Sequence, residues 1–322
     1  MHMTKTRKAV EYIKIFLIII LVFAILSLIG KDILIGIKKS YSVIDERENS
    51  IQITCVGNSN LYSAFSPLDL WNKYGYASTV CASARQTIEE SRHIMKKHFE
   101  KQSPKLVIIE TDMLFEHRPK KQNFCKKSNC IKDFLRRINP AFLKEDIENV
   151  FSTLKNNKFT HGYRYSSKVC AIRCGNYMSK TDSSEEISAQ STEQMDRLIM
   201  LCRENNAKIL FVEIPSVSSW NYERHNAAKK FARERNIDFV DFNLLYNELK
   251  LSPTQCYRDK GCHLNYDGAK AVTEYIGNYI KNSIPLKNLK SDTDYENWNE
   301  AYLKFVNYKL RSQTSLFKQL LL

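Results

Sequence analysis

Short apolar runs alternate with amphipathic segments along most of this chain, and this alternation constrains the fold more than any other feature. Residues 51–56 form a largely apolar, β-branched run, and residues 106–109 are continuously apolar. Such runs are typical of parallel strands that are covered on both faces. Helical spacing of apolar residues follows in segments such as 84–100. We therefore expect an α/β fold in which a parallel sheet is built through right-handed crossovers.

The expected elements can be placed along the chain before any site is considered. They are strands ending near residue 59 and at 76–81, 106–109, 208–214 and 239–241, with helices at 67–74, 84–100, 191–206, 222–235, 243–249 and 266–282. The helix at 191–206 is expected to begin with a capping box at Ser191. Residues 113–190 are basic and rich in turn formers, with weak helices near 131–138 and 140–154. This length exceeds that of an ordinary loop, so we interpret it as an insertion over the carboxyl edge of the sheet, either shaping access or serving as a structural excursion.

The first strand runs directly into a turn that carries a serine. Its last residues are followed by Gly57-Asn58-Ser59-Asn60, all of which favour tight turns. A strand, a turn and a helix in this order present the Ser59 hydroxyl at the carboxyl edge of a parallel sheet. The alternative is a polar β-turn without chemistry.

An aspartate and a histidine share one short loop about 200 residues later. Asp259 and His263 precede the start of the last helix of the body. A serine needs a base to accept its proton, and the base needs a carboxylate to hold its tautomer. The spacing therefore makes Ser59, His263 and Asp259 the candidate catalytic residues.

At these positions the chain resembles the SGNH/GDSL hydrolases, most of all their membrane-anchored cell-envelope members in Gram-positive bacteria. The resemblance covers roughly residues 50–284, and the matching positions are Gly57 to Ser63, Pro67, Trp71, Ala82 to Thr87, Glu213 to Pro215, Trp220, Asp259, His263 to Asn265, Gly268 and Ala269. It implies a flavodoxin-like three-layer α/β/α sandwich. It also implies that Ser59 is the nucleophile, His263 the base and Asp259 the carboxylate that orients the base.

Two positions depart from the family pattern. The family usually spaces its acid as Asp-x-x-His, but Lys260 stands three residues before His263 and Asp259 one further back. The strand end at 109–112 lacks the Asn that usually completes the oxyanion hole. We expect the remaining oxyanion donors to be the amides of Ser59 and of the Ala82–Ser83 turn. Residues expected to line the substrate site are Asn60, Arg85, Trp220, His225 and Asn265.

The N-terminal segment and the net charge of +14 indicate where such a domain works. Residues 12–30 approach the ~20 apolar residues that a bilayer requires, and basic residues precede them. We expect a cytoplasmic N-terminus at 1–11, an uncleaved signal anchor at 12–30, a linker at 31–49 and an extracytoplasmic body; a cleaved signal peptide is the alternative. The chain lacks nucleic-acid-binding motifs, so an anionic lipid or polymer is the expected partner of the basic surface.

Nine cysteines suit an oxidising compartment, where most should pair. Three pairs are close in sequence: Cys125 with Cys130, Cys170 with Cys174, and Cys256 with Cys262. A zinc site built from the first four is the alternative, although its spacing is loose. We expect no metal and no other cofactor.

Together these features predict an extracytoplasmic serine esterase or O-acyltransferase that acts on acyl groups of a cell-envelope polymer or glycan. A membrane acyl-transfer protein is a further candidate partner. The alternative is a catalytically inactive envelope assembly or binding protein on the same fold. The tail, residues 285–322, carries Trp298, Tyr302 and Phe305 on one helical face, which can pack on the body or lie on the bilayer.

Overall fold

The computed structural model describes residues 46–115 and 159–320 of the 322-residue chain. The expected signal anchor at 12–30, the weak helices at 131–138 and 140–154, and the pair Cys125 and Cys130 lie outside the described residues. Within the described ranges, no helix combines the length and the apolar character needed to cross a membrane.

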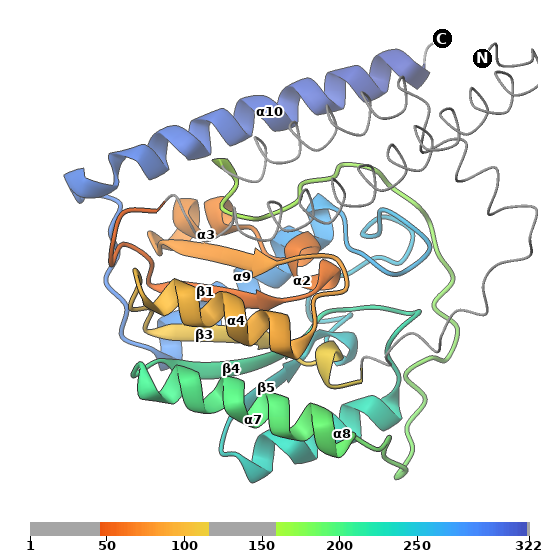
Figure 1. Cartoon of the computed structure of the whole chain (residues 1–322). Helices are drawn as coiled ribbons and strands as arrows, with labels where there is room; N and C mark the ends of the chain where they lie inside the picture. The colour runs from red at the N-terminus through yellow and green to blue at the C-terminus, as the bar shows by residue number, and fades with distance from the viewer. Residues whose placement is uncertain (1–45, 116–158, 321–322) are drawn as a thin grey trace, which may run out of the picture. The chain divides into compact units, whose positions relative to one another are not determined.

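Five parallel strands form the sheet in the described part of the chain (Figure 1). They are β1 (Ile53–Gly57), β2 (Ser78–Ala82), β3 (Leu106–Glu110), β4 (Lys208–Glu213) and β5 (Asp238–Asp241), in the order β2-β1-β3-β4-β5. The expectation of a parallel α/β sheet is confirmed, and the strand order is that of flavodoxin-like folds. In such sheets the strand order reverses between β1 and β3, so a crevice for ligands is expected at their carboxyl ends.

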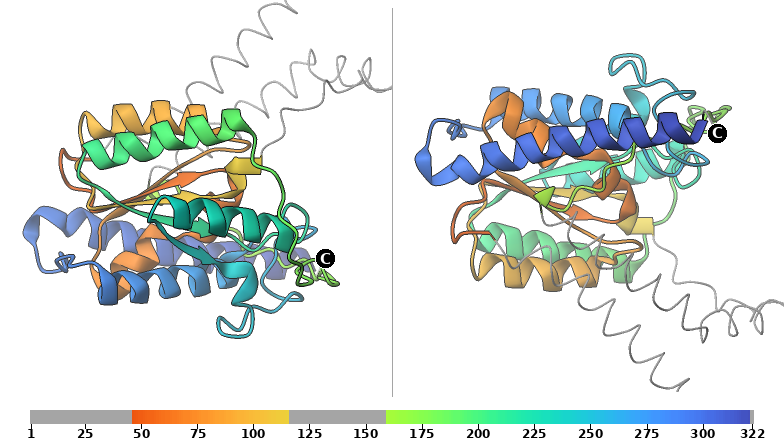
Figure 2. Two further views of the ribbon diagram at one scale, coloured as in Figure 1. Left: turned by 90° about the horizontal axis from the view of Figure 1, so that it is seen from below. Right: turned by 90° about the horizontal axis from the view of Figure 1, so that it is seen from above.

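Side chains alternate across the sheet and meet helices on both faces. Ile53 and Cys55 pack with one buried cluster, whereas Val56 packs with the other. The first cluster lies under α2 (Ser59–Ala64), α3 (Pro67–Tyr74) and α9 (Tyr266–Ser283). The second lies under α4 (Ile88–Phe99), α7 (Ala189–Glu204) and α8 (Tyr222–Glu234). The two views in Figure 2 show these helices as layers on opposite faces of the sheet.

Several element boundaries differ from the sequence-based expectations. The helix predicted from residue 84 begins at Ile88, because Arg85 adopts a positive φ of 54° and Thr87 forms the capping box with Glu90. The helix predicted from residue 191 begins at Ala189 and is capped by Ser188, so the capping box predicted at Ser191 was wrong. Instead of a helix at 243–249, only a 3₁₀ turn, η2 (Phe242–Leu244), is found.

The C-terminal helix α10 (Glu296–Leu320) packs on the body through its first turns. Trp298 and Phe305 are buried, and the Trp298 ring lies 5.3 Å from that of Trp71 on α3. The Trp71 indole also donates a hydrogen bond to Asn299 at 3.0 Å. One face of the tail helix is therefore part of the core that supports α3 (Figure 1).

Candidate active site

The serine turn follows directly from the end of β1. Asn58 caps α2 by accepting a hydrogen bond from the Asn60 amide at 2.9 Å, so Ser59 is the first residue of this helix. The Asn58 amide donates to Glu110 Oε2 at 2.6 Å. A Cβ atom at Gly57 would lie 2.4 Å from the same Glu110 oxygen, so only glycine fits here. Close packing of β1 against the end of β3 thus fixes the position of Ser59.

The histidine loop is folded back on itself before α9. Tyr257 and Leu264 form an isolated antiparallel bridge, and the Arg258 amide donates to the His263 carbonyl at 3.1 Å. Gly261 lies within this loop and has a φ of 95°, a conformation that other residues rarely adopt. The fold of the loop brings Asp259 and His263 to the same side.

Ser59, His263 and Asp259 form one continuous hydrogen-bonded chain. His263 Nε2 lies 2.8 Å from Ser59 Oγ, and His263 Nδ1 lies 2.5 Å from Asp259 Oδ2. The other carboxylate oxygen, Oδ1, accepts the amides of Cys262 at 2.9 Å and of His263 at 3.0 Å. The extra residue between the aspartate and the histidine therefore does not prevent their contact.

The electrostatics of the pair suit a neutral imidazole beside a carboxylate. Burial opposes ionisation of Asp259, but hydrogen bonds from the side chain and amide of His263 outweigh it and lower the pKa of the carboxyl. Burial also lowers the pKa of His263; the hydrogen bond to Asp259 acts in the opposite direction, and the positive charges of Arg258 and Arg164 lower the pKa further. At neutral pH His263 can therefore accept the proton of Ser59.

The expected oxyanion donors lie on the strand next to β1. Ala82 pairs with Gly57 in the sheet register, so Ser83 follows at the level of the serine turn. The Ser83 hydroxyl is buried and makes no hydrogen bond within the described residues. An oxyanion role for the Ser59, Ala82 and Ser83 amides stays a prediction, as does substrate lining by Asn60 and by the exposed Arg85.

Three residues expected to line the site have other partners. His225 and Trp220 are buried, and both bond Asp241 Oδ2, at 2.8 and 2.9 Å. Asn265 is also buried, because it caps α9 by accepting the amides of Asp267 and Gly268. The three side chains are thus engaged at the end of β5 and at the start of α9, and their lining of the substrate site stays a prediction.

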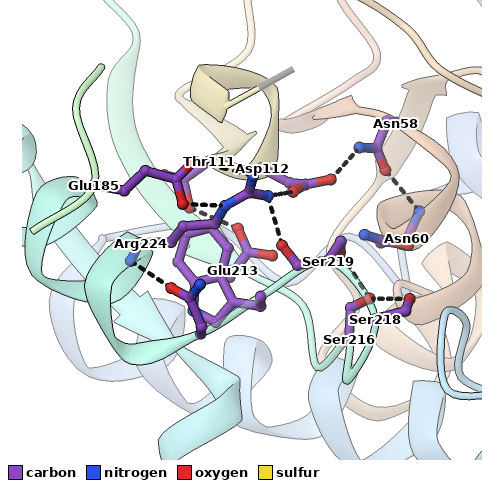
Figure 3. Close-up of polar contacts among 12 residues, drawn as sticks. Asn58, Asn60, Thr111, Asp112, Glu185, Glu213, Ser216, Ser218, Ser219 and Arg224 are labelled. Atoms are coloured by element: carbon purple, nitrogen blue, oxygen red, sulfur yellow. Dashed lines mark hydrogen bonds and ion pairs between the residues drawn. The ribbon is translucent and has the colours of Figure 1, made fainter. Parts of the chain in front are cut away.

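The Asn58 side chain is linked to a network of charged side chains that the sequence did not predict (Figure 3). Asn58 Nδ2 donates to Asp112 Oδ2 at 2.9 Å, and Asp112 Oδ1 lies 3.5 Å from Arg224, which also pairs with Glu185. Burial raises the pKa of Asp112, while Asn58 and Arg224 lower it. In the sequence Asp112 was only a carboxylate at the end of a strand, and Arg224 on α8 belonged to no recognisable motif.

A second buried carboxylate lies below this network. Glu213 at the end of β4 accepts the Thr111 hydroxyl at 2.8 Å, and its pKa is raised well above the usual value by burial and by the neighbouring Asp112, Glu110 and Asp241. The raised pKa favours the uncharged acid, in which the repulsion between these groups is smaller. Its hydrogen bond with Thr111 links the ends of β3 and β4 (Figure 3).

The Tyr62 ring lies between His263 and two arginines in a chain of ring contacts. The Tyr62 ring lies one helical turn after Ser59 and stacks on the imidazole, with 6.4 Å between ring centroids. The guanidinium carbons of Arg164 and Arg258 lie 4.1 and 5.8 Å from the centroid of the same ring. No pattern in the sequence singled out Arg164, because it lies within the irregular stretch at 113–190.

The cysteines of the described ranges are free thiols. Cys256 Sγ accepts the Ser252 amide, and Cys262 Sγ lies 2.9 Å from the Ser218 hydroxyl, so the two sulfurs have different partners. The expected bridges between Cys256 and Cys262 and between Cys170 and Cys174 are therefore not formed in the structure. The zinc alternative needs Cys125 and Cys130, which lie outside the described residues; the described His, Cys, Asp and Glu side chains contain no group suited to a metal ion.

Fold and site together define a parallel α/β protein with a hydrogen-bonded Ser–His–Asp chain at the carboxyl edge of its sheet. No protein-family model and no curated protein sequence matches this chain.

Among solved structures, the chain is similar to a GDSL-like lipase from Bacteroides thetaiotaomicron, with 12% identity, a TM-score of 0.37, and coverage of 72% of this chain and 88% of that one. It is also similar to the lipase/acylhydrolase from Enterococcus faecalis, with 11% identity, a TM-score of 0.38, and coverage of 74% and 99%. Both likenesses are distant, so the roles of the side chains are inferred from the geometry of this chain alone.

Proposed function

We propose that this chain is a serine esterase or O-acyltransferase of the SGNH/GDSL type. The observation that carries the proposal is the Ser59–His263–Asp259 chain, with 2.8 Å from His263 Nε2 to Ser59 Oγ and 2.5 Å from His263 Nδ1 to Asp259 Oδ2. This is the geometry in which an imidazole activates a serine hydroxyl.

In the first half of the reaction, Ser59 Oγ attacks the carbonyl carbon of an ester while His263 Nε2 takes the hydroxyl proton. Asp259 holds the imidazole and stabilises its positive charge. The negative charge on the carbonyl oxygen is met by the amide of Ser59 and by an amide of the Ala82–Ser83 turn. The tetrahedral intermediate then expels the alcohol, which receives the proton from His263, and the acyl group stays on Ser59.

In the second half, water or a hydroxyl group attacks the acyl-enzyme. His263 takes a proton from the attacking group, the bond to Ser59 Oγ breaks, and Ser59 recovers its proton. Water as the acceptor makes the protein an esterase, and a polymer hydroxyl makes it an O-acyltransferase.

The place of action that we propose is the outer side of a cell membrane, on acyl groups of an envelope polymer or glycan. The basic residues before the apolar segment at 12–30 and the net charge of +14 support this location and an anionic surface as partner. A membrane protein that supplies or accepts the acyl group is a further candidate partner.

Turnover of a simple ester by the full-length protein tests this function. We expect wild-type protein to release p-nitrophenol from p-nitrophenyl acetate, and Ser59→Ala to abolish the release. Adding an acetyl-free glycan separates the two activities, because a transferase also forms glycan O-acetyl groups. An absence of both products, with an unchanged envelope phenotype of Ser59→Ala cells, would contradict the proposal and favour the binding-protein alternative.

A further inference from the structure

Two positively charged groups stand beside the catalytic histidine without a carboxylate of their own. In the described part of the chain, neither Arg164 nor Arg258 forms an ion pair, whereas Arg224 pairs with Asp112 and Glu185. The Nε atom of Arg164 is buried and lacks a hydrogen-bond partner there. An arginine held in this state keeps unused donors that suit an anion.

The protein holds both guanidinium groups against one aromatic ring. Both lie over the Tyr62 ring, at 4.1 Å for Arg164 and 5.8 Å for Arg258. Arg258 Nη1 donates to the carbonyl of Arg164 at 3.4 Å, and the Arg164 amide donates to the carbonyl of Tyr62 at 2.8 Å. Two like charges gathered in this way repel each other unless a negative charge compensates them.

Asp259, the carboxylate that follows Arg258 in the chain, is already occupied. Asp259 bonds His263 with one oxygen and the amides of Cys262 and His263 with the other. Both arginines lie against the Tyr62 ring, and this ring stacks on the His263 imidazole, so the two positive charges are near the reacting groups. A negative group bound between them would therefore lie next to the ester that Ser59 attacks.

We propose that Arg164 and Arg258, supported by Tyr62, form a subsite for an anionic group, carboxylate or phosphate, that the acylated substrate carries close to its ester. This inference rests on the proposed function and specifies its substrate class: acyl esters of an anionic molecule rather than of a neutral one. The planar fork of arginine matches both carboxylate and phosphate.

Matched esters test the subsite in the full-length protein. The probes are glycerol monoacetate, which is neutral, O-acetylglycerol phosphate and O-acetylglycerate. We expect Arg164→Gln and Arg258→Gln each to lower kcat/KM for at least one anionic ester about tenfold or more relative to the neutral ester, as the loss of a charge-assisted hydrogen bond should. Whichever anionic ester loses more identifies the preferred anion, phosphate or carboxylate.

The control removes one positive charge elsewhere. Arg197→Gln changes an exposed arginine on α7 that pairs with Glu193, and we expect it to leave the ratio of anionic to neutral kcat/KM unchanged. Equal loss for the anionic and neutral esters in the Arg164 and Arg258 variants would overturn the subsite.

Binding to a Ser59→Ala background separates the inference from the proposed function, because it needs no turnover. Calorimetry should give a Kd for O-acetylglycerol phosphate or O-acetylglycerate that rises about tenfold or more when Arg164→Gln or Arg258→Gln is added. If none of the esters is turned over but this difference in Kd is observed, only the proposed catalytic activity is refuted. Turnover of the neutral ester with no dependence of anion binding on the arginines would refute only the subsite.

Discussion

Asp259 uses both of its carboxylate oxygens on the loop that holds His263. Replacing it with Asn keeps the size but removes the charge and presents an NH₂ donor to His263 Nδ1 or to the two amides. We expect Asp259→Asn to preserve the fold and to lower kcat about 10²–10⁴-fold through the wrong imidazole tautomer. Ester turnover by the purified variant, with circular dichroism as the check on folding, measures this. A rate within about threefold of wild type would show that Ser59 and His263 act as a dyad.

The pH dependence of activity follows from the environment of His263. Only the neutral imidazole can accept the Ser59 proton, and burial together with Arg258 and Arg164 holds the pKa of His263 below the usual 6.5. The rate should therefore fall as the pH drops through this lowered pKa and reach its plateau before neutrality. The acid limb of kcat/KM for a neutral ester reports this group in the free enzyme. A midpoint above pH 6.5 would contradict the described surroundings of His263.

At the site, the sequence predicted the three reacting side chains better than the residues that surround them. Ser59, His263 and Asp259 could be singled out because a serine turn and an Asp/His loop have local signatures. Trp220, His225 and Asn265 were predicted to line the site, but the sequence could not show that they are buried against Asp241 or at a helix start. Arg164 has no signature, because only tertiary contacts bring it to Tyr62.

The connection between β1 and α2 depends on Gly57. Any Cβ there would meet Glu110, whose Oε2 also holds the Asn58 amide. We expect Gly57→Ala to cost about 1–3 kcal/mol of unfolding free energy and to lower kcat, because the displaced Glu110 moves the serine turn. Denaturant unfolding and ester turnover measure the two effects.

Gly175→Ala is the matched control for this change. Gly175 has a φ of 54°, and its Cβ position is open, with nothing within 4 Å. The control should therefore show only the cost of the left-handed conformation, about 1 kcal/mol, with kcat unchanged. A normal kcat in Gly57→Ala would contradict the role given to the β1–β3 contact.

At the level of helices and strands, buried apolar runs predicted β1 and β3, because a parallel strand covered on both faces consists mostly of apolar residues. The edge strand β5 is short and mostly half-buried or exposed, so its signal in the sequence was weaker. The short α2 could not be predicted, since its six residues contain no helical repeat and depend on Asn58 and on packing over β1. Thr87 and Glu90 form the capping box that marks the true start of α4, but the sequence-based prediction began the helix at residue 84. Arg85 has a left-handed backbone conformation, so the helix cannot include residues 84–85.

The orientation of the whole protein in a membrane is a prediction from its N-terminal residues. Basic residues before the apolar segment at 12–30 favour a cytoplasmic start and an external body. Protease added to intact cells without a wall should therefore degrade the body, while a cytoplasmic marker protein stays intact. Protection of the body equal to that of the marker would place it inside and contradict the envelope substrate.

The central claim is that His263 and Asp259 make Ser59 a nucleophile, and labelling with a fluorophosphonate tests it most directly. We predict that the wild-type protein forms one covalent adduct, located on Ser59 by peptide mass spectrometry, because an activated serine attacks the phosphorus and expels fluoride. The adduct should be absent in Ser59→Ala and form far more slowly in His263→Ala. An unlabelled wild-type protein, or a label that forms equally fast without His263, would contradict the account.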